Sequence, residues 1–170
     1  MPPLNRRQTG FLVRFFGLLI LFYVVVTPVA VDEAVIKPFT RGLAAVSAAA
    51  LNAIGQDVTL AGTVIHNSAF AVDIQNGCNG VEALVFLCAA IFAFEAPLRA
   101  RILGVLAGAV AVQALNIIRI ASLFLLGRYR RDLFETFHLG VWQTLIFGAA
   151  VGIFIFWTRR FGRAGAVAAS

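Results

Sequence analysis

The chain has 170 residues, of which 61% are hydrophobic and 13% are charged, and its mean hydropathy is +0.91. Soluble domains contain roughly 45–50% apolar and about 25% charged residues, so this composition excludes an ordinary soluble globular domain. The net charge of +6 lies mainly on arginines that flank apolar segments. That distribution is typical of a membrane protein in contact with anionic lipid, and it argues against nucleic acid as a partner.

Apolar stretches of suitable length predict about four transmembrane helices. A helix needs about 20 apolar residues to cross a hydrocarbon core of roughly 30 Å. We therefore predict an all-α membrane protein, with residues 1–170 forming a single integral membrane domain. The predicted spans cover residues 11–31, 78–96, 102–126 and 139–158, between tails at 1–10 and 159–170.

The long segment 32–77 separates the first two spans and changes character half-way. Apolar residues recur at helical spacing from 36 to 54, which predicts an amphipathic helix on the membrane surface or packed on the bundle. Farther on, alternating apolar residues predict two short strands around the turn His66-Asn67-Ser68, and therefore a short β-hairpin. A shorter loop is expected at residues 127–138.

The distribution of arginine predicts the orientation of the chain. With both termini in the cytoplasm, the inner segments carry mostly arginine and a single acid, Glu95, whereas the outer segments 32–77 and 127–138 hold most of the acids. A basic cluster in the last outer loop is the exception: Arg128, Arg130 and Arg131. It could bind a substrate or a head group of the outer leaflet.

Cys78 is the first candidate for chemistry. It lies in the segment 76–80, Asn-Gly-Cys-Asn-Gly, whose glycines permit a sharp turn and a close approach to a substrate. At the start of a helix, its thiolate would be stabilised by free N–H groups and the helix dipole. Cys88 lies deep in an apolar run and is interpreted as a packing residue. On one helix the two thiols would be roughly 15 Å apart, too far for a disulfide.

Arg119 is the second candidate, because it lies inside a long apolar stretch. Placing a guanidinium in lipid costs at least about 2.5–3.5 kcal/mol, so a functional reason is expected. Arg119 could stabilise an oxyanion or bind a substrate carboxylate; alternatively it forms a structural ion pair, with Glu82 as the candidate partner. Asn116 lies one turn earlier on the same face and either extends this polar cluster or makes an interhelical hydrogen bond.

His138 is the third candidate and lies at the predicted start of the last span. It could accept the proton of a thiol and later protonate a leaving amine; alternatively it is an interfacial histidine with no special role. The predicted topology brings Cys78, Arg119 and His138 to one membrane face, where we expect catalysis. Glu82 could orient the histidine or pair with the arginine. The expected substrate-binding or supporting residues are Asn76, Asn79, Gly80, Glu82 and Asn116.

These motifs resemble the exosortase/archaeosortase family of membrane transpeptidases, and in length the small exosortase H-type members. The matching elements are Cys78-Asn79-Gly80 at the start of one span, the segment 116–119 (Asn-Ile-Ile-Arg) inside the next, and Phe137-His138 before the last, so the resemblance covers roughly residues 57–157. It implies a cysteine transpeptidase or protease with Cys78 as nucleophile, His138 as acid and base, and Arg119 as oxyanion or substrate stabiliser.

The resemblance also implies a substrate and a location. The expected partners are membrane lipid and the C-terminal sorting tail of an exported protein, which combines a short motif, a transmembrane helix and a basic cluster. The expected location is the bacterial inner membrane, with the site on the extracytoplasmic side. No cofactor or metal is expected, because two histidines and one plausible thiol are too widely spaced for zinc.

Two other functions remain open from the sequence. In a non-enzymatic membrane assembly factor, Cys78 would be an ordinary residue. In a small transporter, Arg119 and Glu82 would line a polar path.

Overall fold

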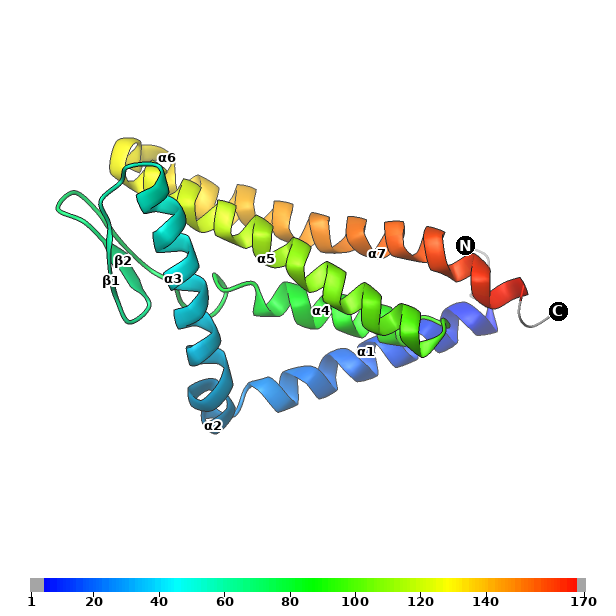
Figure 1. Cartoon of the computed structure of the whole chain (residues 1–170). Helices are drawn as coiled ribbons and strands as arrows, with labels where there is room; N and C mark the ends of the chain where they lie inside the picture. The colour runs from blue at the N-terminus through cyan, green and yellow to red at the C-terminus, as the bar shows by residue number, and fades with distance from the viewer. Residues whose placement is uncertain (1–4, 168–170) are drawn as a thin grey trace.

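The computed structural model describes the backbone of residues 5–167 and the side chains of residues 5–161; the outermost parts of both expected tails, 1–4 and 168–170, lie outside the described residues. Four helices run alongside one another: α1 (Arg6–Val26), α4 (Val81–Ala93), α5 (Leu98–Tyr129) and α7 (Trp142–Val167). The start of α1 and the end of α7 lie at the same end of the bundle (Figure 1). The expected mostly helical membrane fold is confirmed.

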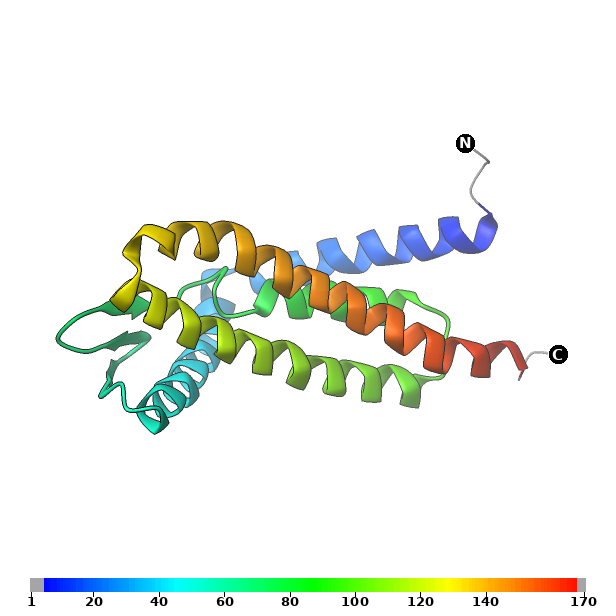
Figure 2. The ribbon, with the colours of Figure 1, turned by 90° about the horizontal axis from the view of Figure 1, so that it is seen from above.

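The first helix ends earlier than expected, at Val26 rather than residue 31. Pro28 explains the break, because proline lacks the backbone N–H that the next helical hydrogen bond needs, and its own backbone is extended, with ψ at 136°. The chain then continues through α2 (Val29–Val31), the π-helix η1 (Asp32–Ile36) and α3 (Lys37–Ala53). These helices lie across the end of the bundle, as both views show (Figures 1 and 2). The helix expected over 36–54 is therefore confirmed.

The set of long apolar helices differs from the expected one. Among the described residues, four helical segments are long and apolar enough to cross a membrane: Arg6–Val26, Val29–Ala53, Leu98–Tyr129 and Arg131–Phe161. The second of these lies across the bundle (Figure 1). The helix expected over 78–96 occupies only Val81–Ala93, about 20 Å at 1.5 Å per residue. Its flanks, at 75–80 and 94–97, are not helical, so α4 alone is too short for a roughly 30 Å core.

The expected hairpin is confirmed, but it is part of a three-stranded antiparallel sheet, which has one strand more than was predicted. The strands are β1 (Thr59–Ala61), β2 (Val64–His66) and β3 (Ala71–Asp73), in the order β1-β2-β3. Gly62 splits the first expected strand: its φ of +66° suits the first position of a two-residue hairpin turn. The sheet packs on α3 and the end of α5 through a buried apolar cluster that includes Leu51, Ile65, Ile74 and Phe124.

The segment 127–138 is helical, which corrects the expectation of a loop. Helix α5 extends to Tyr129, the chain reverses at Arg130, and α6 (Arg131–Glu135) and the π-helix η2 (Thr136–Val141) lead directly into α7. Apolar residues within this polar stretch account for the difference. Phe134, for example, packs its ring on that of Phe70 at 5.7 Å between centroids, which anchors α6 on the sheet.

The basic cluster at this corner has partners within the molecule. Arg128 donates a hydrogen bond to Gln56 Oε1 at 2.8 Å, and Arg131 donates to the carbonyl of Ala69 at 3.1 Å. Arg130 forms an exposed ion pair with Asp132 at 2.9 Å. The cluster therefore ties the corner between α5 and α6 to the segment that carries the sheet.

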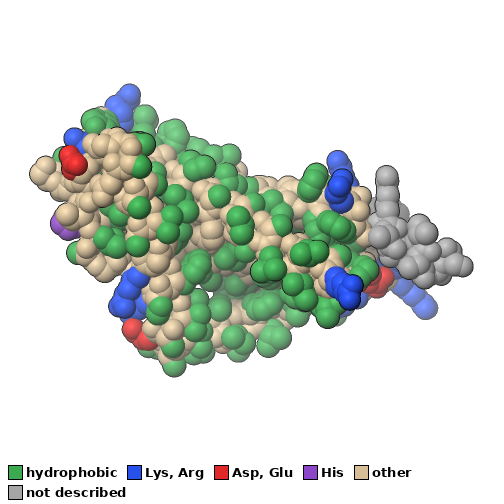
Figure 3. Space-filling view, viewed as in Figure 1, with side chains coloured by type: hydrophobic (Ala, Val, Ile, Leu, Met, Phe, Trp, Pro, Cys, Tyr) green, Lys and Arg blue, Asp and Glu red, His purple; other side chains and the backbone are tan. Residues whose placement is uncertain are grey.

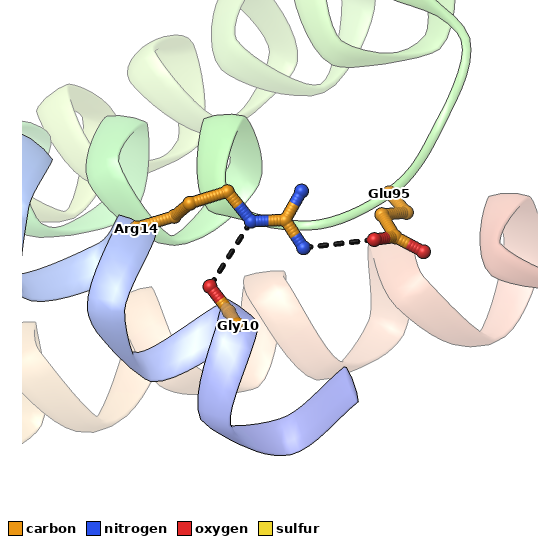
Figure 4. Close-up of polar contacts among 3 residues, drawn as sticks. All are labelled: Gly10, Arg14 and Glu95. Carbon is orange, nitrogen blue, oxygen red and sulfur yellow. Dashed lines mark hydrogen bonds and ion pairs between the residues drawn. The ribbon is translucent and has the colours of Figure 1, made fainter. Parts of the chain in front are cut away.

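The opposite end of the bundle is joined by aromatic rings and one ion pair. Phe94 contacts the rings of Phe154 and Trp157, with centroid distances of 6.1 and 5.8 Å. Beside them, Arg14 Nη2 lies 2.9 Å from Glu95 Oε1 and its Nε donates to the carbonyl of Gly10 (Figure 4). Along the flank, hydrophobic side chains cover the surface, whereas Lys and Arg gather at the two ends (Figure 3). This distribution suits a bilayer.

Candidate active site

A non-helical turn before α4 carries Cys78. The N–H of Cys78 donates to the carbonyl of Gln75 at 2.9 Å, and glycines flank the cysteine closely on both sides. Gly80 is the N-cap of α4 and has φ +76°. A Cβ at this position would lie 3.1 Å from Gln113 Nε2 and 3.2 Å from Asn116 Nδ2. Only glycine therefore gives both the backbone conformation and the close approach to α5.

Polar side chains of α5 satisfy the backbone of this turn. Gln113 Nε2 donates to the carbonyl of Asn79 at 3.2 Å, Asn116 Nδ2 to that of Cys78 at 3.1 Å, and Arg119 Nη1 to that of Gly77 at 3.3 Å. The three donors are spaced three residues apart and so lie along one side of the helix. Irregular backbone inside a membrane protein requires such partners. Sequence reasoning missed Gln113, although this spacing was a visible signal.

Glu82 binds the same turn from α4. Its Oε1 accepts a hydrogen bond from the N–H of Gly77 at 2.9 Å. Among the described residues, Glu82 forms no ion pair with Arg119 and no hydrogen bond with His138. The two contacts considered for Glu82 from the sequence are therefore not those of the structure.

Two asparagines connect the turn to the helices that cross the bundle end. Asn79 is fully buried; its Nδ2 donates to Thr40 Oγ1 of α3 at 3.0 Å and its Oδ1 accepts from the N–H of Val81 at 3.1 Å. Asn76 Nδ2 donates to Asp32 Oδ1 at 3.0 Å. The turn is thus held from three sides, and Thr40 is a supporting residue that the sequence did not reveal.

The structure brings together the three predicted catalytic side chains. Cys78 Sγ lies 3.0 Å from His138 Nε2, and Arg119 Nη2 donates to the same sulfur at 3.7 Å. Arg119 is only 2% exposed. Because α4 begins at Val81, Cys78 precedes the first helical turn. The sulfur therefore has an imidazole and a guanidinium as polar neighbours, instead of the helix N–H groups expected from the sequence.

His138 lies in the π-helix η2, where the sequence predicted the end of a loop. Single π-helical turns are frequent at functional sites because they re-aim a side chain within a continuous helix. The ring lies 5.4 Å from that of Phe134, which limits its movement on one side. Among the described side chains no carboxylate hydrogen-bonds the imidazole, so thiol and imidazole form a pair, with Arg119 as the third member of the group.

A cavity of about 210 Å³ opens at the sulfur. Cys78, Arg119 and His138 line it together with residues 70–74 and an apolar wall of Ile120, Leu123 and Phe134. A nucleophile, a base and a fixed cation around one cavity are the groups that acyl transfer requires. Within the described part of the chain, no three His, Cys, Asp or Glu side chains are placed to hold a metal ion.

Comparison with known families agrees with this geometry. The family model described as transmembrane exosortase (Exosortase_EpsH) matches residues 7–156, which includes most of every helix in the bundle. The chain belongs to the transmembrane exosortase family. The match extends to α1, beyond the region of residues 57–157 on which the motif resemblance was based. Neither a search of curated proteins nor a search of solved structures finds a match for this exosortase.

Membership of the family, together with the long apolar helices, makes this exosortase an integral membrane protein. The other cysteine does not belong to the polar group. Cys88 lies in the apolar helix α4 and, like Cys78, is a free thiol, as the spacing along one segment predicted.

Proposed function

We propose that this exosortase is a membrane-embedded cysteine transpeptidase or peptidase that cleaves the C-terminal sorting tails of exported proteins. The observation that carries the proposal is the contact of 3.0 Å between Cys78 Sγ and His138 Nε2, with Arg119 3.7 Å from the same sulfur. A nucleophile within hydrogen-bond reach of a base is the minimum arrangement for covalent catalysis. Family membership supports the same class of enzyme.

The proposed reaction begins when His138 Nε2 accepts the proton of the Cys78 thiol. The sulfur attacks the carbonyl carbon of a peptide bond in the tail and forms a tetrahedral intermediate. The bond between carbon and nitrogen then breaks, and His138 returns its proton to the leaving amine. A thioester remains on Cys78 and is resolved by an acceptor nucleophile in transfer, or by water in hydrolysis.

Arg119 acts through fixed positive charge. Its guanidinium is held by the carbonyl of Gly77 and faces the sulfur, so it stabilises the thiolate and the oxyanion that develops on the substrate carbonyl. Preorganised charge is more effective in a site shielded from water, because the surroundings need not reorganise during the reaction. This assigns a function to a charge that is costly to place inside an apolar helix.

The site would lie on the extracytoplasmic side of the bacterial inner membrane. It lies at the end of the bundle opposite the start of α1 and the end of α7 (Figure 1). The arginine distribution favours cytoplasmic termini, which puts Cys78 outside. The transmembrane helix of a sorting tail would then lie beside the bundle, with its motif at the level of the cavity.

The alternative functions have less support. Arg119 and Glu82 bind the carbonyl and the N–H of the same residue, Gly77, and they line two separate cavities, so they do not share one polar path. A non-enzymatic assembly factor would have no use for a thiol in contact with an imidazole beside a cavity.

Co-expression with candidate tail-bearing proteins tests the function, with cleavage read as a change in substrate mass. We expect Cys78→Ala to abolish cleavage, because no other thiol contacts the imidazole. Cys88→Ala is the matched control and should leave the cleavage rate unchanged. Equal effects of the two substitutions would refute the assignment of the nucleophile.

The orientation has its own test. In a Cys88→Ala background, a membrane-impermeant maleimide added to intact spheroplasts should label Cys78. Labelling that requires lysis would reverse the proposed topology without affecting the assignment of the nucleophile.

A further inference from the structure

The third strand of the sheet has a free edge. Within residues 5–167, strand β3 pairs with β2 on one side only, because the order is β1-β2-β3. The N–H of Asn67 donates to the carbonyl of Phe70 at 3.0 Å, and the N–H of Ile74 donates to that of Thr63 at 3.1 Å. In an antiparallel pair, hydrogen-bonded positions alternate along the strand. The backbone N–H and C=O groups of Ala71 and Asp73 therefore point away from β2, toward the free edge.

This edge lies along the active-site cavity. The five consecutive residues 70–74 line the cavity together with the apolar wall. Side chains alternate along a strand, so a strand that presented one face to the cavity would contribute only every second residue to its lining. The unbroken run 70–74 therefore indicates that the edge of the strand borders the cavity. Ala71 and Asp73, whose backbone groups point outward, are both exposed. The unpaired groups thus share one cavity with Cys78.

Neighbouring side chains leave the outward backbone groups of Ala71 and Asp73 unoccupied, but they occupy the backbone that precedes Ala71. The Asp73 carboxylate accepts hydrogen bonds from Gln75 Nε2 at 2.8 Å and from Thr63 Oγ1 at 2.7 Å, and these bonds lower the pKa of the carboxyl. Its oxygens are therefore engaged by the sheet and the following turn. Arg131 Nη2 donates a hydrogen bond to the carbonyl of Ala69 at 3.1 Å. The accessible edge accordingly begins at Ala71.

We propose that the free edge of β3 binds the substrate as an added β-strand. This inference rests on the proposed function and specifies how the tail is recognised. An extended segment next to the scissile bond would hydrogen-bond through its main chain to Ala71 and Asp73 and present a carbonyl to Cys78. Three strand residues span about 10 Å, room for about three substrate residues.

The shape of the cavity adds a requirement on the substrate side chains. In a strand laid along β3, every second side chain faces the wall formed by Ile120, Leu123 and Phe134. A cavity of about 210 Å³ favours a compact side chain, and this wall favours an apolar one. The tail must also be extended at the cleavage point, because a helix has no free backbone groups to offer to a strand edge.

Alkylation of Cys78 by two reagents tests the proposal on the full chain in detergent, in a Cys88→Ala background. Acetyl-tetraalanyl chloromethyl ketone can form the added strand, whereas the single-residue acetyl-alanyl chloromethyl ketone cannot. We expect the longer reagent to react roughly tenfold faster or more, because each additional main-chain hydrogen bond strengthens its binding. Methylation of the backbone nitrogens of alternate residues gives two versions of the longer reagent. The version whose methylated nitrogens face β3 should lose the rate advantage, and the other version should keep it.

Two proline variants provide the matched comparison. Ala71→Pro removes an outward N–H and leaves every bond to β2 intact, which an edge strand tolerates. Leu60→Pro does the same on β1. Ala61 and Thr59 pair with Val64 and His66 through their backbone groups, so the N–H of Leu60, which lies between them, points outward. Ala71→Pro should lose the preference for the longer reagent, measured as the ratio of the rates of the two chloromethyl ketones. Leu60→Pro should keep this preference.

The outcomes separate this inference from the proposed function. Equal rates for the two chloromethyl ketones, or an undiminished preference in Ala71→Pro, would overturn strand addition and leave Cys78 as a reactive nucleophile. If Cys78 reacts with no reagent, the proposed function fails. Strand addition is then tested separately, by amide hydrogen exchange of the Cys78→Ala variant in the presence of acetyl-tetraalanine amide. Slower exchange at Ala71 and Asp73 supports strand addition, and unchanged exchange overturns it.

Discussion

The two ends of the bundle are built from different interactions. At the Cys78 end, three side chains of α5 hydrogen-bond to three successive carbonyls of one turn. At the opposite end, the rings of Phe94, Phe154 and Trp157 pack together beside an exposed ion pair. Hydrogen bonds depend steeply on distance and angle, whereas ring contacts accept a range of geometries. Substitutions should therefore change chemistry at the first end and only stability at the second.

Replacing the histidine should have the largest effect. His138→Ala removes the proton acceptor of Cys78, and general acid–base catalysis contributes about 10²–10⁴-fold to a rate. We expect a loss of that size in tail cleavage, with little change in the thermal unfolding midpoint. His66→Ala, which changes the other histidine, is the control and should cleave normally. A His138→Ala variant with the wild-type rate would exclude the histidine from the chemistry.

The glycine at the start of α4 gives the next largest effect. Gly80→Ala and Gly77→Ala both place a Cβ at positive φ, but only at position 80 does the new atom meet α5, at 3.1 Å from Gln113 Nε2. The clash should cost about 1–3 kcal/mol beyond the shared backbone strain. We expect Gly80→Ala to lower both the unfolding midpoint and the cleavage rate more than Gly77→Ala does. Equal losses would mean that the contact with α5 does not position the turn.

At the aromatic end, an added methyl should affect stability alone. In Gly104→Ala the Cβ would clash with the indole ring of Trp157, which is buried and donates a hydrogen bond to the carbonyl of Ala100. Overpacking of this kind costs about 1–3 kcal/mol, so the unfolding midpoint should fall. Gly148→Ala, with no atom within 4 Å, should be silent. A change in cleavage per folded molecule would show that the two ends are coupled.

The smallest effect is expected at the exposed ion pair. The side chains of Arg14 and Glu95 are 43% and 66% exposed, and such pairs contribute about 0.2–1 kcal/mol. Glu95→Gln should lower the unfolding midpoint slightly, and added salt should reduce the difference from wild type. A loss as large as that of Gly104→Ala would place this pair among the main supports of the bundle.

Much of the site could be predicted because topology alone determines it. Once three consecutive apolar segments are assigned, Cys78, Arg119 and His138 must fall at one end of the bundle. Their contacts in the structure agree with that prediction. The amphipathic helix was equally accessible, because α3 follows a regular apolar period.

The hydrogen bonds that support the site could not be predicted, because hydropathy indicates which residues are buried and does not indicate which residues contact one another. Nothing in the sequence pairs Asn79 with Thr40, 39 residues away, or directs Glu82 to the N–H of Gly77. The segment 127–138 is rich in charge and was interpreted as a loop. Its arginines instead hold a helical corner against Gln56 and Ala69.

The shortness of α4 determines how deep the reactive sulfur lies. Helix α5 continues beyond Arg119 to Tyr129, about 15 Å farther along its axis, before the chain reverses. The thiol is therefore recessed beneath the corner at Arg130 and the sheet. Under the proposed function, a polypeptide anchored in the bilayer would reach the thiol by lateral diffusion at that depth, whereas the corner and the sheet would obstruct a protein that arrives from the aqueous phase. The enzyme would thus select membrane-anchored substrates over soluble proteins before it recognises any residue of a motif.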